Sequence, residues 1–105
     1  MKLATWNVNS IRSRERHVRR WLGRVQPDLL LLQEIKCEAP AFPDFSDLGY
    51  RAEIVGQKAY NGVAVLARVP VEIRLRALAG LPEADAQARY LEVAADGIVV
   101  GGLYL

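Results

Sequence analysis

Four consecutive leucines, residues 29–32, form the longest uninterrupted apolar run in the first third of the chain. Pro27 and Asp28 precede the run, and Gln33 and Glu34 follow it. An apolar run without alternation predicts a strand buried on both faces, as in the centre of an α/β sheet. Ligands bind where such strands end, so Glu34 is a site candidate, although a surface acid is the simpler interpretation of one glutamate.

A second strand is predicted at residues 2–7, and it too ends in a polar cluster, residues 7–10. Between the two strands an apolar stripe recurs at i, i+3, i+4 and i+7, which predicts an amphipathic helix. The stripe consists of Val18, Trp21, Leu22 and Val25. Ser13 is the predicted N-cap, with Glu15 in the first turn, and Gln26-Pro27 ends the helix.

Strand, helix and strand make a βαβ unit, in which the two strands are parallel. If the strands are also neighbours, Asn7 and Glu34 lie side by side at the same end of the sheet. An amide and a carboxylate from distant parts of the chain are then brought together, which favours a site over two unrelated surface residues.

The remaining pattern predicts mainly strands and loops. Strands are predicted at residues 50–55, 62–67, 71–76, 89–94 and 98–105. Asp96-Gly97 between the last two is a strong hairpin signal. Residues 37–49 read as a loop with one helical turn, pinned to the core by Phe42, Phe45 and Leu48, and residues 79–88 as another loop. One βαβ unit followed by antiparallel strands predicts an α/β sandwich with a mixed sheet.

The 105 residues, with a formal net charge of +2 and 51% hydrophobic residues, suit one small globular domain. No apolar run approaches the roughly 20 residues that span a bilayer, and no secretory signal is present, so we expect no membrane partner and a cytoplasmic location. Cys37 is the only cysteine, which excludes an internal disulfide. A strand pattern still in progress at residues 103–105 leads us to expect that residues 1–105 are a partial domain.

Basic charge is concentrated in residues 12–24, which hold six arginines and one glutamate, a local charge of +5. The other eight basic and eleven acidic residues leave −3 for the rest of the chain. Six arginines cannot all pair with one acid, so this segment indicates a polyanionic partner as strongly as a merely solvated helix face. Arg12 is predicted to lie in the loop before the helix, facing the candidate site.

Four segments together resemble the exonuclease III branch of the endonuclease/exonuclease/phosphatase superfamily. They are residues 6–12, 27–28, 32–36 and 60–64. The family comprises Mg²⁺-dependent AP endonucleases and 3′-exonucleases of DNA repair. The resemblance implies a four-layered, DNase I-like α/β sandwich with two packed sheets, of which this chain is the N-terminal portion.

The resemblance also implies roles for the two strand-end residues. Glu34 is the expected carboxylate ligand of the metal, and Asn7 an uncharged amide at the same catalytic and metal site. Asn7 would hold a phosphate oxygen or a catalytic carboxylate elsewhere. Mg²⁺, for which Mn²⁺ is an expected substitute, binds few carboxylates together with waters and phosphate oxygens. It would polarise the scissile phosphodiester and offset charge on the leaving oxygen.

Further residues are expected to contact DNA on the same basis. Arg12 and Ser13 would hold phosphates, and Tyr60 and Asn61 would approach the DNA backbone. Gln33 would contact DNA or support Glu34, and Lys36 would place positive charge near the phosphate. Each also has a plain structural interpretation, such as a solvated lysine or a half-buried tyrosine. The expected partner is double-stranded DNA with abasic sites or 3′ ends, and the full-length protein is expected to be a monomer.

Hydrolysis needs a base to activate water and further acidic ligands, and the resemblance implies that the residues with these roles lie beyond residue 105. We therefore expect the 105 residues alone to lack nuclease activity and to be marginally stable. Two other functions stay open from the sequence. One is a phosphatase or phosphodiesterase of the same superfamily, and the other is a non-catalytic module that binds nucleic acid through its basic helix.

Overall fold

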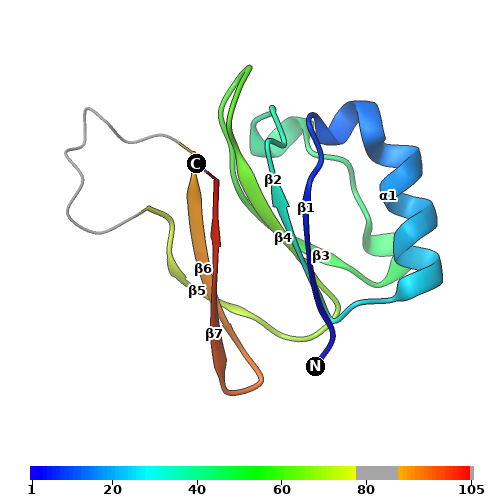
Figure 1. Cartoon of the computed structure of the whole chain (residues 1–105), viewed down its shortest axis with the longest axis vertical. Helices are drawn as coiled ribbons and strands as arrows, with labels where there is room; N and C mark the ends of the chain where they lie inside the picture. Colours follow the sequence, from blue (N-terminus) through cyan, green and yellow to red (C-terminus); the bar gives the residue numbers. More distant parts are fainter. Residues whose placement is uncertain (78–87, 105) are drawn as a thin grey trace.

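A computed structural model describes residues 1–77 and 88–104 of the chain, and these residues form three layers (Figure 1). A single α-helix covers one face of a four-stranded sheet, and a three-stranded sheet covers the other face. The predicted loop at residues 79–88 lies almost wholly outside the described residues. No helix among them is both long enough and apolar enough to span a bilayer.

The predicted βαβ unit is confirmed. Strands β1 (Leu3–Asn7) and β2 (Leu29–Gln33) are parallel neighbours, joined by helix α1 (Ile11–Val25). Their register pairs Leu3 with Leu29 and Asn7 with Gln33, so both strands end at the same level. All four leucines of β2 are buried, as the lack of alternation predicts.

The helix begins earlier than predicted, because the cap is Ser10 and not Ser13. The Ser10 hydroxyl oxygen accepts a hydrogen bond from the Ser13 backbone N–H at 3.3 Å. Ile11, fully buried, also donates its backbone N–H to the Ile35 carbonyl at 3.1 Å, which anchors the first turn to the sheet. Arg12 therefore lies within the first turn, not in the preceding loop, and Glu15 lies beyond that turn.

Two more strands complete the first sheet. β3 (Arg51–Val55) pairs antiparallel with β4 (Val63–Ala67), which pairs antiparallel with β2, so the strand order is β1-β2-β4-β3. Every residue of β4 is buried. β2 and β4 are the interior strands, and their two faces pack against α1 on one side and the second sheet on the other.

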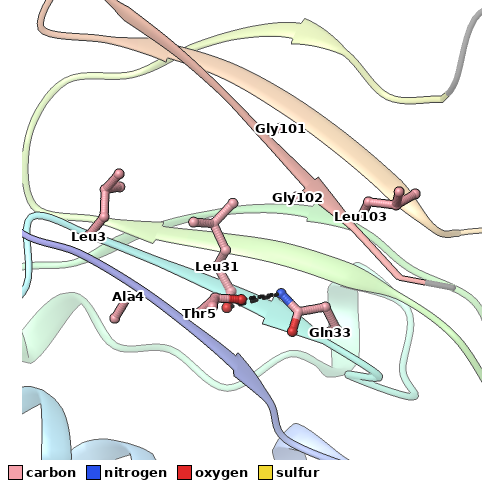
Figure 2. Close-up of a pocket in the computed structure, with 8 residues that line it drawn as sticks. All are labelled: Leu3, Ala4, Thr5, Leu31, Gln33, Gly101, Gly102 and Leu103. Carbon is pink, nitrogen blue, oxygen red and sulfur yellow. Dashed lines mark hydrogen bonds between the residues drawn. The ribbon is translucent and has the colours of Figure 1, made fainter.

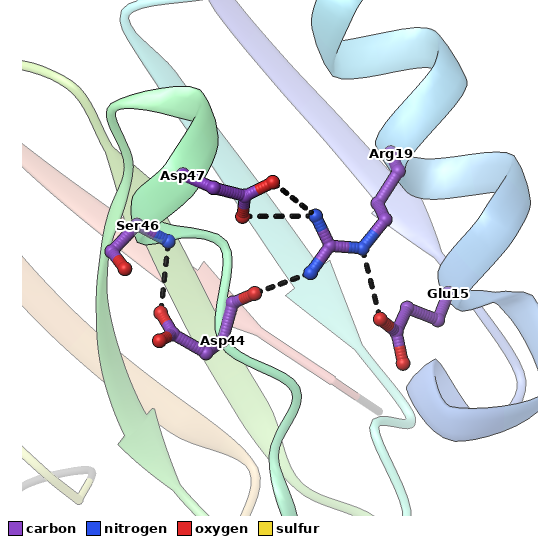
Figure 3. A network of polar contacts seen from close by, with 5 residues as sticks. All are labelled: Glu15, Arg19, Asp44, Ser46 and Asp47. Atoms are coloured by element: carbon purple, nitrogen blue, oxygen red, sulfur yellow. Dashed lines mark hydrogen bonds and ion pairs between the residues drawn. The ribbon is translucent and has the colours of Figure 1, made fainter.

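The loop between β2 and β3 contains two short 3₁₀ turns, η1 (Ala39–Ala41) and η2 (Ser46–Leu48), where one turn was predicted. Phe45 is buried and Phe42 half-buried, as predicted, but Leu48 is 37% exposed and does not pin the loop. Arg19 of α1 fastens η2 instead: its guanidinium contacts both Asp47 carboxylate oxygens at 3.0 Å and the Glu15 carboxylate at 2.9 Å (Figure 3). These contacts raise the pKa of Arg19, through Glu15 first and then Asp47.

The second sheet is antiparallel, with order β5-β6-β7. Its strands are β5 (Glu72–Leu75), β6 (Tyr90–Ala95) and β7 (Ile98–Leu103). Asp96 and Gly97 join β6 to β7 with φ of 50° and 78°, the left-handed pair that a tight hairpin requires, which confirms that prediction. The fold is thus a mixed, mostly antiparallel α/β sandwich with two sheets. A fourth layer is not present among the described residues.

Candidate functional site

Three loops meet at the end of the sheet where β1 and β2 finish, and we call this the site end: residues 7–11, 33–36 and 60–62. Backbone hydrogen bonds continue past the strands. Val8 donates to the Gln33 carbonyl at 3.0 Å, and Ser10 to the Glu34 carbonyl at 2.8 Å. On the other side, Lys36 donates to the Asn61 carbonyl at 3.0 Å. The Glu34 segment is therefore held between the other two loops.

Left-handed backbone conformation is concentrated at the site end. Of the seven non-glycine residues with positive φ in the described chain, five lie here: Asn9 (45°), Ser10 (84°), Glu34 (55°), Lys36 (57°) and Asn61 (57°). Each such residue costs of order 1–3 kcal/mol and persists only where surrounding contacts impose it. Strained backbone of this kind clusters at functional sites, and here it bends the chain sharply beyond two strand ends.

Asn7 and Glu34, the two residues predicted to form the core of the site, lie at this end, as the strand register requires. Asn7 pairs with Gln33 across the parallel strands, so Glu34 is one residue further along the neighbouring strand. The Asn7 side-chain oxygen accepts the Asn9 backbone N–H at 3.2 Å. The Glu34 carboxylate is half-buried and has no hydrogen bond or ion pair with any residue that the structure describes. A carboxylate in that position is available to a cation.

Lys36 is also held at the site end. Its ammonium group donates to the Asn9 side-chain oxygen at 2.6 Å, which places a fixed positive charge beside the Asn7 loop. Asn9 does not stand out in the sequence as a site residue. Its signal was the residue type itself, because asparagine adopts the left-handed conformation more readily than most residues.

Asn61 is oriented inward. It is 9% exposed, and its side-chain N–H donates to the Gln57 side-chain oxygen at 3.1 Å. The same oxygen accepts the Ala88 backbone N–H at 2.9 Å, so Gln57 joins two loops that the sequence does not place together. Gln57 was missed because no local pattern marks it. The Asn61 side chain supports the site end from within, and a contact of its own with DNA stays a prediction.

Gln33 points elsewhere than its neighbours in sequence. Its side-chain N–H donates to the Thr5 hydroxyl at 2.9 Å, on the face of the first sheet that looks toward β7 (Figure 2). There it lines a groove of about 520 Å³ between the two sheets. The groove is lined otherwise mainly by apolar and glycine residues: Leu3, Ala4, Thr5, Leu31, Gly101, Gly102 and Leu103. Of the groove residues, Gln33 is the one that belongs to the site end.

The other residues predicted to contact DNA are accessible. Arg12 and Ser13 are exposed in the first turn of α1, and Tyr60 is 66% exposed directly before Asn61. Arg12 lies close enough to Cys37 to oppose electrostatically the rise in the Cys37 thiol pKa that burial causes. The basic first turn therefore adjoins the segment that follows Glu34.

The donor set at the site end suits a hard cation that keeps much of its hydration. Glu34 offers a carboxylate, and Mg²⁺ takes one or two carboxylates with waters and phosphate oxygens. The Asn7 side-chain oxygen already accepts the Asn9 N–H, so Asn7 as a metal ligand stays a prediction. Within residues 1–77 and 88–104, no three His, Cys, Asp or Glu side chains gather as a complete protein ligand set. The Glu34 carboxylate thus fits a hard cation as one of several ligands.

Comparison with known proteins identifies the family of this chain. Residues 4–103 match the model of the Endonuclease/Exonuclease/phosphatase family. The chain belongs to this family. It is 36% identical over 95 residues to exodeoxyribonuclease III of Haemophilus influenzae, a match that covers 87% of this chain and 34% of that protein.

Solved structures of the family share the fold. An AP endonuclease from Archaeoglobus fulgidus superimposes with a TM-score of 0.90 at 38% identity, over 99% of this chain and 40% of that one. The 3′ phosphatase NExo from Neisseria, solved bound to a product DNA hairpin, gives a TM-score of 0.87 at 37% identity, over 99% of this chain and 41% of that one. The chain therefore spans about two fifths of the length of these relatives.

Proposed function

We propose that this chain carries part of a DNA phosphodiesterase site, in which Glu34 holds a Mg²⁺ ion and Asn7 orients a phosphate oxygen. The observation that carries the proposal is that Asn7 ends β1 and Glu34 directly follows the adjacent parallel strand β2, with no partner among the described residues for the Glu34 carboxylate. The relatives support it, since they are exodeoxyribonuclease III, AP endonuclease and DNA 3′ phosphatase.

The residues of the chain have distinct parts in this proposal. Glu34 binds the cation, which when present withdraws charge from the phosphate oxygens and the leaving oxygen. Asn7 donates its amide N–H to a phosphate oxygen without adding negative charge near a polyanion, while its carbonyl oxygen stays with Asn9. Lys36, fixed by Asn9, attracts the phosphate group.

The proposed substrate is duplex DNA that carries an abasic site or a 3′ end. Arg12 and Ser13 in the first turn of α1 and the exposed Tyr60 loop flank Glu34, and they would position the backbone without reading sequence. Water activation requires a general base, which none of these residues is placed to supply. We therefore expect the 105-residue chain to bind Mg²⁺ and DNA without turning over abasic duplex.

Glu34→Gln tests the proposal directly. The substitution removes the charge and keeps the shape, so Mg²⁺ affinity, measured by chemical-shift titration of the chain with MgCl₂, should fall by about tenfold or more. Glu38→Gln is the matched control, because Glu38 is an exposed carboxylate in the same connection and its affinity effect should be negligible. Equal Mg²⁺ affinity in the Glu34→Gln variant and the wild-type chain would refute the metal site.

A further inference from the structure

The exposed face of α1 consists of cationic and small polar side chains. They are Arg12, Ser13, Arg16, His17, Arg20 and Arg24. Four arginines recur at every fourth position and therefore form one line along the helix. We call Arg12, Arg16, Arg20 and Arg24 the arginine stripe.

The described residues of the protein do not neutralise the stripe. None of its four guanidinium groups has a hydrogen bond or ion pair with a residue that the structure describes. Glu15, the only acid of the helix, forms an ion pair with Arg19, which also forms an ion pair with Asp47 (Figure 3). Like charges four residues apart destabilise a helix, so the stripe is a cost to the isolated chain that an external anion would remove.

The position and chemistry of the stripe favour the DNA backbone. From Arg12 to Arg24 it extends about 18 Å along the helix, roughly the rise of five base pairs. It starts in the turn that adjoins the site end and continues away from it. Guanidinium groups bind phosphate through two hydrogen bonds, and the face offers no apolar side chain that would enter a membrane or a protein interface.

We propose that the arginine stripe is a second DNA-binding surface, which holds the phosphate backbone of duplex DNA beyond the segment bound at the site end. In this proposal Arg16, Arg20 and Arg24 bind backbone phosphates, and all three lie outside the site end. This inference extends the proposed function but does not depend on metal binding at Glu34.

The test compares two double variants of equal charge. Arg20→Gln/Arg24→Gln shortens the stripe, and Arg51→Gln/Arg74→Gln removes two exposed arginines from β3 and β5. Binding of an intact 20-base-pair duplex to the whole chain is measured by fluorescence anisotropy from 50 to 200 mM NaCl. The slope of log affinity against log salt should fall by about 1.8 in magnitude for the stripe variant and hardly change for the control.

Two results would overturn the proposal: equal slopes for both double variants, or labelled poly-L-glutamate binding the wild-type chain as tightly as the duplex. The second would identify an acidic protein segment as the partner. Far-UV circular dichroism of both variants checks that α1 is retained. Two separate measurements keep the proposals apart: Mg²⁺ affinity of Glu34→Gln in the MgCl₂ titration tests the metal site, and the salt slopes of the two arginine double variants test the stripe.

Discussion

The two ends of the four-stranded sheet differ in how their polar and charged side chains are paired. At the end opposite the site, Asp28 accepts the Lys2 backbone N–H at 2.7 Å and the Arg68 side chain at 3.2 Å. The Tyr50 hydroxyl donates to the Pro27 carbonyl at 2.6 Å, and the Lys2 ammonium to Val25 at 2.7 Å. Charged and polar groups at that end are satisfied by one another.

The site end has the reverse character. It contains five left-handed non-glycine residues and a carboxylate, Glu34, without a partner in the described chain. Contacts at the opposite end therefore stabilise the sheet. The strained backbone at the site end lowers stability but holds side chains in position for a ligand. Substitutions at the two ends should therefore differ in size and in kind.

The largest effect is expected at Gly62, which has a φ of +91°. A Cβ there would lie 2.5 Å from Ile35 Cγ1, so Gly62→Ala combines backbone strain with overpacking and should lower the free energy of unfolding by about 3 kcal/mol. Urea unfolding followed by tryptophan fluorescence measures this. Gly49→Ala is the control, since Gly49 has a φ of +86° but open space around it, and should cost about 1 kcal/mol. Equal costs would show that the site end is not tightly packed.

A smaller effect is expected at Gln57, whose side-chain oxygen accepts from both Asn61 and Ala88. Gln57→Leu leaves both donors unpaired and should lower stability by about 2 kcal/mol. Amide hydrogen exchange of Lys36, which donates to the Asn61 carbonyl, should speed up as well. Gln57→Glu keeps an acceptor oxygen and should retain most of the stability and most of the Lys36 amide protection. Similar losses of stability in the Gln57→Leu and Gln57→Glu variants would contradict this role.

The smallest effect is expected at Asp28, at the end of the sheet opposite the site, and it concerns stability at low pH. The Lys2 backbone N–H, and to a lesser degree Arg68, lower the pKa of Asp28 below its ordinary 3.8. A lowered pKa means that the charged form is stabilised by folding, so this contribution is complete above pH 4 or so and is lost as the pH falls through the lowered value. Asp28→Asn should therefore flatten the dependence of stability on pH between about 5 and 2, as measured by urea unfolding.

The sheet could be predicted from sequence because burial leaves a strong local signal. The leucine run identified β2 as an interior strand, and the βαβ spacing identified β1 as its parallel neighbour. Asn7 and Glu34 were brought together by that topology alone. The helix start could not be predicted, because Ser10 and Ser13 are equivalent candidates by type and the choice depends on the bond from Ile11 to Ile35.

The role of Gln57 and the direction of the Gln33 side chain also could not be predicted, because both depend on tertiary contacts. Gln57 acts on Ala88, which is 31 residues away, and the contact exists only once the loops are folded. The direction of Gln33, toward Thr5 and the groove, follows from the alternation of β2 faces, but the buried leucines on both faces hide that alternation. Roles at the site end thus depend on tertiary contacts that no local pattern records.

The strand order β1-β2-β4-β3 has a consequence for how the chain folds. β3 pairs within the sheet only with β4, so the two form a hairpin that must dock as a unit onto β2. The β3–β4 hairpin is local and forms fast. Docking of this hairpin onto β2 is non-local and therefore slower. All four strands end by Ala67, so the strands of this sheet leave the ribosome before β6 and β7 do.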